Sequence, residues 1–133
     1  MENKIKHLEF IQGIITRMNT NSFMIKGWLI TLVSALFALA AKDANRMYIL
    51  IAYIPILPFL IIDGFYLSKE RQFRELYIKV AGMNEKDIDF LMDTSQYKGG
   101  RNTWIRSIFS ITILPFYGSL LIVTLVLMFM IFQ

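Results

Sequence analysis

The chain has no cysteine and only one histidine among its 133 residues. Without cysteine, disulfides, thiol catalysis and cysteine-ligated metal sites are excluded. A histidine-rich metal centre is also excluded, and a serine or cysteine nucleophile paired with histidine would need His7, close to the N-terminus. Phosphate-loop, zinc-protease, hydrolase and dinucleotide-binding motifs are missing as well. The sequence therefore predicts no catalytic residues, no metal and no cofactor.

What the chain has instead is apolar sequence: hydrophobic residues make up 56% and the mean hydropathy is +0.50. Two runs, 22–41 and 47–67, match the roughly 20 residues that cross a hydrocarbon core of about 30 Å. A third run, Ser107–Phe132, is longer and must tilt, kink or extend beyond the core, with Pro115 as the expected kink. A split at 115–118 would leave a leading piece too short to span. We expect an all-α integral membrane protein with spans at 22–41, 47–67 and 104–132.

Charge patterning predicts how the chain crosses the membrane. Twelve of the fourteen lysines and arginines fall on one side if the N-terminus is cytoplasmic, and only Lys42 and Arg46 fall outside. Positive residues are retained inside, which predicts a cytoplasmic N-terminus and an external C-terminus. The net charge of +4 is thus explained by topology, and we expect no binding to nucleic-acid duplexes. A cleaved signal peptide ending near Ala40 is disfavoured because the preceding segment is long and contains Glu2 and Glu9.

The cytoplasmic segments predict a small helical module. Apolar residues recur at helical spacing through 2–20, which predicts an amphipathic helix. It would lie on the inner leaflet or against a partner, or it would extend the first span and pack on the other cytoplasmic helices. Within 68–101, a helix should continue the second span to Gly82, and a short helix through Met92 should follow, capped by Asn84 or Asp87. Residues 94–102 should form a loop.

Lys26 and Asp63 are charged residues inside the first two apolar runs. The joint at 42–46 is short enough to force an antiparallel hairpin, which places the two charges at about the same depth. A lone charge within the membrane costs roughly 2.5–3.5 kcal/mol on insertion scales, so a pair or a polar path is indicated. The pair would either hold the hairpin together or lie at the inner mouth of an ion pathway.

Two stripes of residues on the spans predict helix association. Small residues recur every three or four positions on the first span, which allows close approach of another helix, in the hairpin or between subunits: Gly27, Thr31, Ser34, Ala38 and Ala41. Hydroxyl side chains follow the same spacing in the third run. They could line a pore formed by several copies, or bond to their own helix and its neighbours. The members of this second stripe are Thr103, Ser107, Ser110, Leu114, Tyr117, Leu121, Thr124 and Met128, with Ser107, Ser110, Tyr117 and Thr124 as the pore candidates.

The amphipathic start, the segments 21–28 (NSFMIKGW) and 62–66 (IDGFY), and the charged helix that follows resemble small bacterial membrane effectors of anti-phage defence, in particular the channel-like effector of the Hailong system. The resemblance implies a bacterial inner-membrane channel that depolarises the membrane and is regulated by a nucleotide-type ligand at its cytoplasmic face. Basic residues would contact that ligand, although topology and solvated helix faces also explain them: Arg71, Arg74, Lys79, Lys98 and Arg101.

We therefore expect a homo-oligomeric ion channel or pore of four or more subunits, surrounded by the lipid bilayer and gated from the cytoplasm by a ligand or regulatory protein. The alternative is an accessory or scaffold subunit without catalytic activity, which docks a larger partner through 2–20 and 68–101. A small proton- or ion-coupled transporter that uses Asp63 is a third hypothesis, disfavoured because three spans rarely enclose a substrate site.

Overall fold

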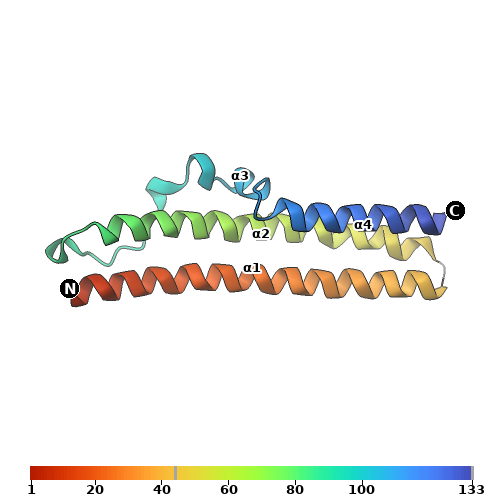
Figure 1. Ribbon diagram of the computed structural model, residues 1–133, viewed down its shortest axis with the longest axis horizontal. Coiled ribbons are helices and arrows are strands. Elements are labelled where there is room, and N and C mark those ends of the chain that lie inside the picture. The colour runs from red at the N-terminus through yellow and green to blue at the C-terminus, as the bar shows by residue number, and fades with distance from the viewer. Residues whose placement is uncertain (44, 133) are drawn as a thin grey trace.

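Two long antiparallel helices form the body of the protein, and a third lies along the half that contains their joint (Figure 1). The computed structural model describes residues 1–43 and 45–132; Ala44, in the predicted joint, lies outside this part of the chain. The described residues form α-helices and single-turn 3₁₀ helices and contain no strand. In chain order the elements are α1 (Glu2–Asp43), α2 (Arg46–Ala81), η1 (Glu85–Asp87), η2 (Ser95–Tyr97), η3 (Gly100–Asn102), α3 (Trp104–Ile108) and α4 (Leu114–Phe132).

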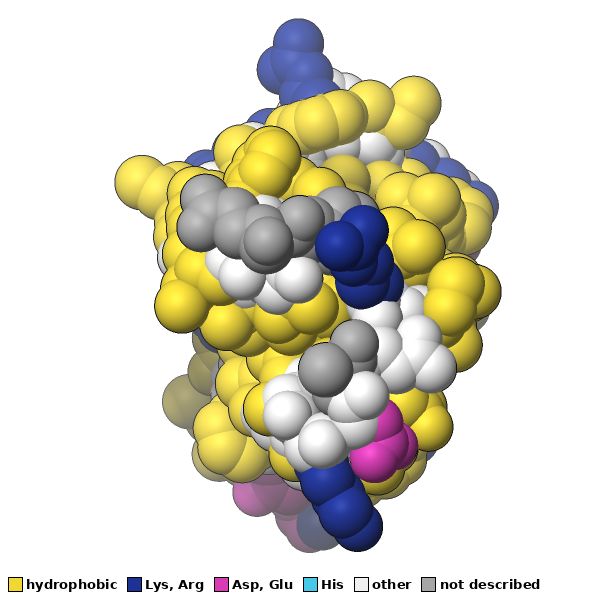
Figure 2. Space-filling view, turned by 90° about the vertical axis from the view of Figure 1, so that its right-hand side faces the viewer, with side chains coloured by type: hydrophobic (Ala, Val, Ile, Leu, Met, Phe, Trp, Pro, Cys, Tyr) yellow, Lys and Arg dark blue, Asp and Glu magenta, His cyan; other side chains and the backbone are white. Residues whose placement is uncertain are grey.

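The predicted fold class is confirmed at the level of three helices, α1, α2 and α4, that are long and apolar enough to cross a membrane. The 19 residues of α4 extend about 28 Å, close to the thickness of a hydrocarbon core. Pro55 and Pro58 lie inside α2, which remains one helix. Seen from the end that holds the joint, hydrophobic side chains cover most of the surface and only a few charges are present (Figure 2).

The predicted amphipathic helix 2–20 and the first span are a single helix, α1, without a break. Its N-terminal half packs on the C-terminal half of α2: Ile11 and Ile15 form a buried cluster with Leu76 and Val80. The sequence left open whether 2–20 lies on the membrane surface or a partner, or extends the first span. In the structure it extends the first span and packs on α2. Apolar residues that could have faced the inner leaflet are instead used to join α1 and α2.

The third apolar run is not one helix, so the prediction of a continuous kinked span is wrong. Helix α3 ends at Ile108, residues 109–113 form turns, and α4 begins at Leu114. Pro115 is the second residue of α4, where its missing backbone N–H removes no helical hydrogen bond. The proline therefore lies in the first turn of the helix instead of bending its interior.

The predicted cytoplasmic module, 68–101, is less helical than expected. Helix α2 ends at Ala81, before Gly82, as expected, but the helix predicted through Met92 is absent and only the turn η1 forms. Within the described chain, the Asn84 side chain makes no capping bond. The Glu85 carboxylate instead accepts hydrogen bonds from the backbone N–H groups of Asn3 and Lys4 at the start of α1. A carboxylate is favoured there because the first N–H groups of a helix lack helical partners.

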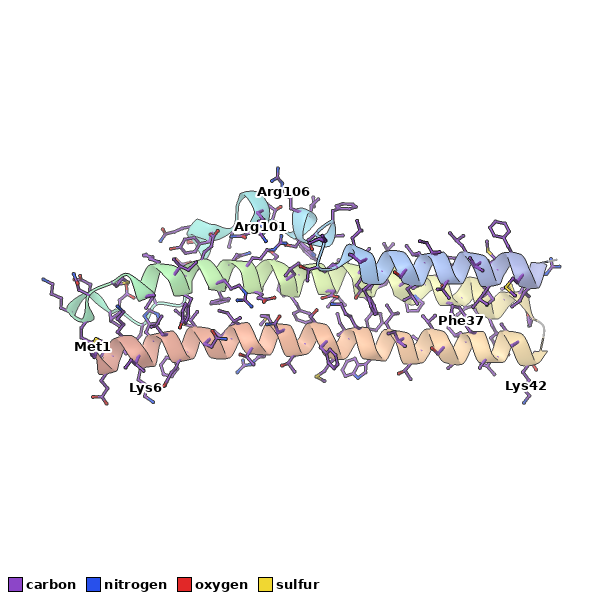
Figure 3. All side chains as sticks on the ribbon, viewed as in Figure 1. Met1, Lys6, Phe37, Lys42, Arg101 and Arg106 are labelled. Atoms are coloured by element: carbon purple, nitrogen blue, oxygen red, sulfur yellow. The ribbon has the colours of Figure 1, made fainter. Side chains whose placement is uncertain are left out.

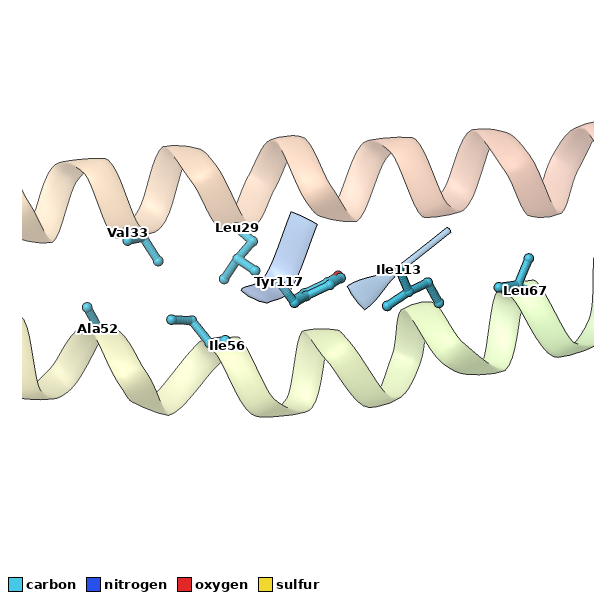
Figure 4. Close-up of a cluster of buried hydrophobic side chains, with 7 residues drawn as sticks. All are labelled: Leu29, Val33, Ala52, Ile56, Leu67, Ile113 and Tyr117. Carbon is cyan, nitrogen blue, oxygen red and sulfur yellow. The ribbon is translucent and has the colours of Figure 1, made fainter. Parts of the chain in front are cut away.

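A second apolar cluster holds together the half of the molecule where α4 lies along α1 and α2 (Figure 4). Leu29 and Val33 of α1 meet Ala52 and Ile56 of α2, and residues from the third run close the cluster. Tyr117 of α4 is 1% exposed and is the largest side chain in this cluster. The hydroxyl of Tyr117 reaches beyond the apolar cluster and donates a hydrogen bond to Asp63. The remaining members are Leu67 and Ile113.

Candidate functional site

A polar cluster lies where α1, α2 and α4 meet, beside the first turn of α4. We call Ser22, Lys26, Asp63 and Tyr117 the inner cluster. Lys26 Nζ lies 2.5 Å from Asp63 Oδ2 and donates to Ser22 Oγ at 2.7 Å. The Ser22 hydroxyl donates to Asp63 Oδ1 and the Tyr117 hydroxyl donates to Asp63 Oδ2 at 3.1 Å. The carboxylate is thus bound by one donor group from each of three side chains on two other helices.

Burial makes this arrangement necessary. The Asp63 side chain is fully buried, whereas 20% of Lys26 is exposed. A buried carboxylate is tolerated only when an opposite charge and hydrogen bonds replace water. The ammonium of Lys26 also lies 5.9 Å from the centre of the Phe116 ring. The predicted pairing of Lys26 with Asp63 is therefore present, and it forms within a single chain.

Helix spacing and one glycine position the members of the cluster. Ser22 and Lys26 are four residues apart, so they lie on the same face of α1. Gly64 follows Asp63, and a Cβ atom there would lie 2.3 Å from Ile108 Cγ1. The missing side chain lets the end of α3 rest directly on α2. That contact fixes where the chain turns before α4, and so where Tyr117 enters the cluster.

The four pore candidates of the third run lie against the chain's own helices. Ser107, Tyr117 and Thr124 are buried at 0–1% exposure. Thr124 donates to the carbonyl of Leu120, the helix-internal bond that the sequence analysis left open. The hydroxyls of Ser107 and Ser110 have no hydrogen-bond partner among the described residues. This stripe is not a free face, so it could surround a shared axis only after the bundle rearranged.

The small-residue stripe of α1 lies on the opposite, outer side. Gly27, Thr31, Ser34, Ala38 and Ala41 are all exposed, and a Cβ on Gly27 would meet nothing within 4 Å in the described part of the chain. Helix α1 packs on α2 through other residues, such as Leu29 and Val33. The interpretation that the stripe packs within the hairpin is therefore wrong. Its face is left available to a further helix.

A groove of about 450 Å³ adjoins this outer face, between α1 and α4. Its lining is mainly apolar and includes Ile30, Phe37 and Leu120, with the hydroxyls of Ser34 and Ser119 at its edge. The groove ends at Phe116, which also contacts Lys26 of the inner cluster. Phe37 is labelled on this part of α1 in Figure 3.

The five basic candidates do not converge on one site. Arg74 pairs with Glu70 on the same helix at 2.7 Å. Arg71 donates to the carbonyl of Arg101 at 2.8 Å, and burial, followed by the Arg101 charge, lowers the pKa of Arg71. Lys79 lines a cavity of about 50 Å³ beside His7, whereas Lys98 lines a different groove, beside α2 and α3.

Sequence analysis missed a second polar group, which we call the loop network: Ser68, Gln72, Thr94 and Asn102. Ser68 Oγ donates to the Asn102 carbonyl at 2.6 Å, and Gln72 Nε2 donates to Ser68 Oγ at 3.1 Å. Thr94 Oγ1 donates to Gln72 Oε1 at 3.0 Å. These bonds fasten the segment 94–102 to α2. One feature of the sequence could have predicted this network. Ser68, Gln72 and Leu76 are spaced four residues apart, so the two polar side chains share a helix face with Leu76, which is buried.

A second missed feature is the buried imidazole of His7, which has 0% exposure. Its Nε2 lies 2.9 Å from the carbonyl of Leu91, and its Nδ1 has no partner among the described residues. The ring also contacts Phe90, whose φ of 56° is unusual for a residue with a side chain. The imidazole thus joins the start of α1 to the segment after η1.

Comparison of the chain with known proteins finds no matching family model, no matching curated protein and no matching solved structure. A functional assignment therefore rests on the geometry of the chain itself.

Proposed function

We propose that the protein forms a homo-oligomeric ion channel or pore in a bacterial inner membrane, and that the inner cluster is its cytoplasmic gate. The observation that carries the proposal is the position of Asp63. This buried carboxylate is bound from α1 and α4 beside the first turn of α4, the end of α4 that lies away from the joint. Intramembrane charges are costly and commonly mark ion pathways. A charge-neutral cluster at that level would keep the inner mouth closed.

The long helices supply a route for control from the cytoplasm. Helices α1 and α2 run without a break from the spans to the cluster of Ile11, Ile15, Leu76 and Val80. A ligand or protein that moved the cytoplasmic ends apart would pull Lys26 and Asp63 apart as well. Water that entered would then hydrate both charges, and the inner mouth that the paired cluster had closed would open.

Association of copies follows from the faces that the single chain leaves open. The small residues of α1, including Gly27 and Ser34, are exposed along one side. Small residues let helix backbones approach closely in lipid, where apolar burial gives no driving force between helices. A ring of copies joined by this face would enclose an axis. On the resemblance to phage-defence effectors, opening of such a ring would depolarise the membrane.

The test is ion flux in liposomes, measured with a potential-sensitive dye under a potassium gradient, together with native mass spectrometry of the purified protein. We expect four or more identical subunits. We also expect Asp63→Asn to raise basal flux at least about tenfold, since the neutral side chain no longer holds Lys26. Glu70→Gln, which disrupts the partly exposed pair with Arg74, is the matched control and should leave flux unchanged.

An oligomer that gives no flux, either as wild type or as Asp63→Asn, would overturn the channel proposal. A monomer or dimer would overturn it too, because neither leaves room for a central path. Circular dichroism and the mass of the Asp63→Asn oligomer check that the variant is folded and assembled. This check distinguishes a folded oligomer that does not conduct ions from a variant that has failed to fold or assemble.

One observation favours the second candidate, an accessory subunit that docks a larger partner. Large apolar side chains are exposed on the cytoplasmic half, among them Phe10 at 54%, Ile78 at 71% and Leu91 at 60%. Such residues often mark protein contacts when they gather in a patch. A partner that co-purifies at fixed stoichiometry and is lost with Ile78→Asp, without any ion flux, would establish the scaffold function.

A further inference from the structure

A groove of about 300 Å³ opens beside α2 at the level where its apolar run ends. We call it the interfacial groove, and its main lining residues are Phe65, Ser68, Lys69, Lys98, Thr103 and Trp104. Two lysines from distant parts of the sequence thus face one hollow. Neither the inner cluster nor the proposed gate uses this groove.

Aromatic side chains form the membrane side of the interfacial groove. The rings of Phe65 and Trp104 pack edge to face, with centres 5.7 Å apart. The indole N–H of Trp104 donates to the carbonyl of Ile61 at 2.8 Å, which fixes the ring against α2. Tryptophan is enriched where the hydrocarbon meets the headgroups. The groove therefore lies at headgroup level on the cytoplasmic side.

The charges around the groove are mostly positive. Lys69 Nζ lies 5.6 Å from the centre of the Phe65 ring, and no carboxylate of the described residues lines the groove. Figure 3 shows Arg101 and Arg106 on the same side of the molecule as α3. The acidic group that acts on Lys98 is Asp93, whose pKa is lowered first by hydrogen bonds from Ser95 and only then by Lys98 and Lys79. The Asp93 carboxylate thus already accepts hydrogen bonds from Ser95.

Positive charge is also in excess on the neighbouring face of α2. Arg71 lies beside Arg101, and burial together with that second guanidinium lowers the pKa of Arg71. The nearby Glu70 is engaged by Arg74 through two hydrogen bonds.

We propose that the interfacial groove binds the phosphate of an anionic phospholipid, with Lys69 and Lys98 holding the phosphate and Phe65 and Trp104 contacting the upper part of the acyl chains. Basic pockets on the cytoplasmic side of membrane proteins suit such headgroups. A soluble phosphate compound offers the same anion, but it makes no use of an aromatic floor that faces the hydrocarbon. The bound lipid would join α2 to the segment that leads into α3, whether or not the protein conducts ions.

The test uses full-length protein in nanodiscs and native mass spectrometry to compare retained phosphatidylglycerol with phosphatidylcholine. We expect wild type to retain phosphatidylglycerol selectively. The double variant Lys69→Gln/Lys98→Gln should bind it about 25-fold more weakly, roughly fivefold per lysine. Lys42→Gln/Lys86→Gln removes the same charge at exposed positions elsewhere and should bind like wild type. Lys69→Arg/Lys98→Arg should keep most of the affinity.

Equal retention of the two lipids by wild type would overturn the proposal, as would equal retention of phosphatidylglycerol by the double variant and its control. A second arm adds inorganic phosphate to wild type in phosphatidylcholine nanodiscs and follows thermal unfolding. We expect no shift at millimolar phosphate. A shift that is lost in the double variant would assign the groove to a soluble anion and overturn the lipid as its occupant. Unchanged ion flux in the double variant would leave the lipid assignment standing, so the two proposals fail separately.

Discussion

The inner cluster and the loop network bury polar side chains in different ways. The inner cluster neutralises a carboxylate with a lysine and uses groups from three helices. The loop network contains no charge and fastens one loop to one helix through Ser68 and Gln72. The first is built around a fully buried carboxylate between candidate spans, where water cannot replace a lost partner, and the second fastens the segment 94–102 to α2.

This difference indicates how each region should respond to damage. Removal of one charge from the inner cluster leaves the other buried without compensation, and all three helices lose a shared contact. Removal of one hydroxyl from the loop network leaves a neutral group that water can reach when the loop opens. The helices joined by the inner cluster should therefore unfold as a unit, and the loop should loosen locally.

The largest effect is expected from Lys26→Met, which leaves Asp63 buried and unpaired. We expect a loss of about 3–5 kcal/mol in the free energy of unfolding, measured by circular dichroism as detergent is exchanged for a denaturing one. The double variant Lys26→Met/Asp63→Leu should recover most of that loss, because no charge is left without a partner. A loss below about 1 kcal/mol for Lys26→Met would contradict the view that the pair is buried as a unit.

A smaller effect is expected at Gly64, where α3 approaches α2. Gly64→Ala places a Cβ 2.3 Å from Ile108 Cγ1 and should destabilise the protein by about 1–3 kcal/mol. Ile108→Ala in the same chain should relieve part of the overlap. Gly13→Ala on α1 is the matched control: a Cβ added there would meet nothing within 4 Å among the described residues, so the melting temperature should stay equal or rise.

The sequence predicted the features of the fold and of the inner cluster that depend on local patterns of residues. The apolar runs predicted α1, α2 and, beyond the break at 109–113, α4, and a joint of five residues sufficed to place Lys26 opposite Asp63. Helical spacing also predicted that the N-terminal half of α1 is amphipathic, although it could not choose between lipid and α2 as the partner of its apolar face. That choice depends on Leu76 and Val80, which lie more than 60 residues further along the chain.

The parts that were missed depend on contacts between distant segments. Tyr117 belongs to a stripe of hydroxyl residues, yet its bond to Asp63 requires the break at 109–113, and that break follows from the approach of Ile108 to Gly64. The loop network joins residues 22–34 positions apart. Hydrophobic spacing has no information about such pairs, because each residue alone is an ordinary polar side chain.

A local effect is expected from Ser68→Ala in the loop network. The variant loses the donor to the Asn102 carbonyl and the acceptor for Gln72, at a cost of about 1–2 kcal/mol. Hydrogen exchange read by mass spectrometry should become faster in residues 94–103 and stay unchanged in α4. Thr20→Ala, at an exposed position on α1 outside the loop, is the control. Faster exchange throughout α4 would mean that the loop and the spans unfold together, and the comparison would fail.

The smallest effect is expected from the second ion pair of α2, between Arg74 and Glu70. Its N–O distance is 2.7 Å, close to the 2.5 Å of the Lys26–Asp63 pair, but the Arg74 side chain is 55% exposed and the pair joins neighbouring turns of one helix. Water solvates Arg74 when Glu70 is removed, so Glu70→Gln should cost less than about 0.5 kcal/mol, and about 0.5 M salt should reduce even that. The same denaturation assay measures both pairs. If Glu70→Gln destabilised the protein as much as Lys26→Met, burial would not be what distinguishes the two pairs.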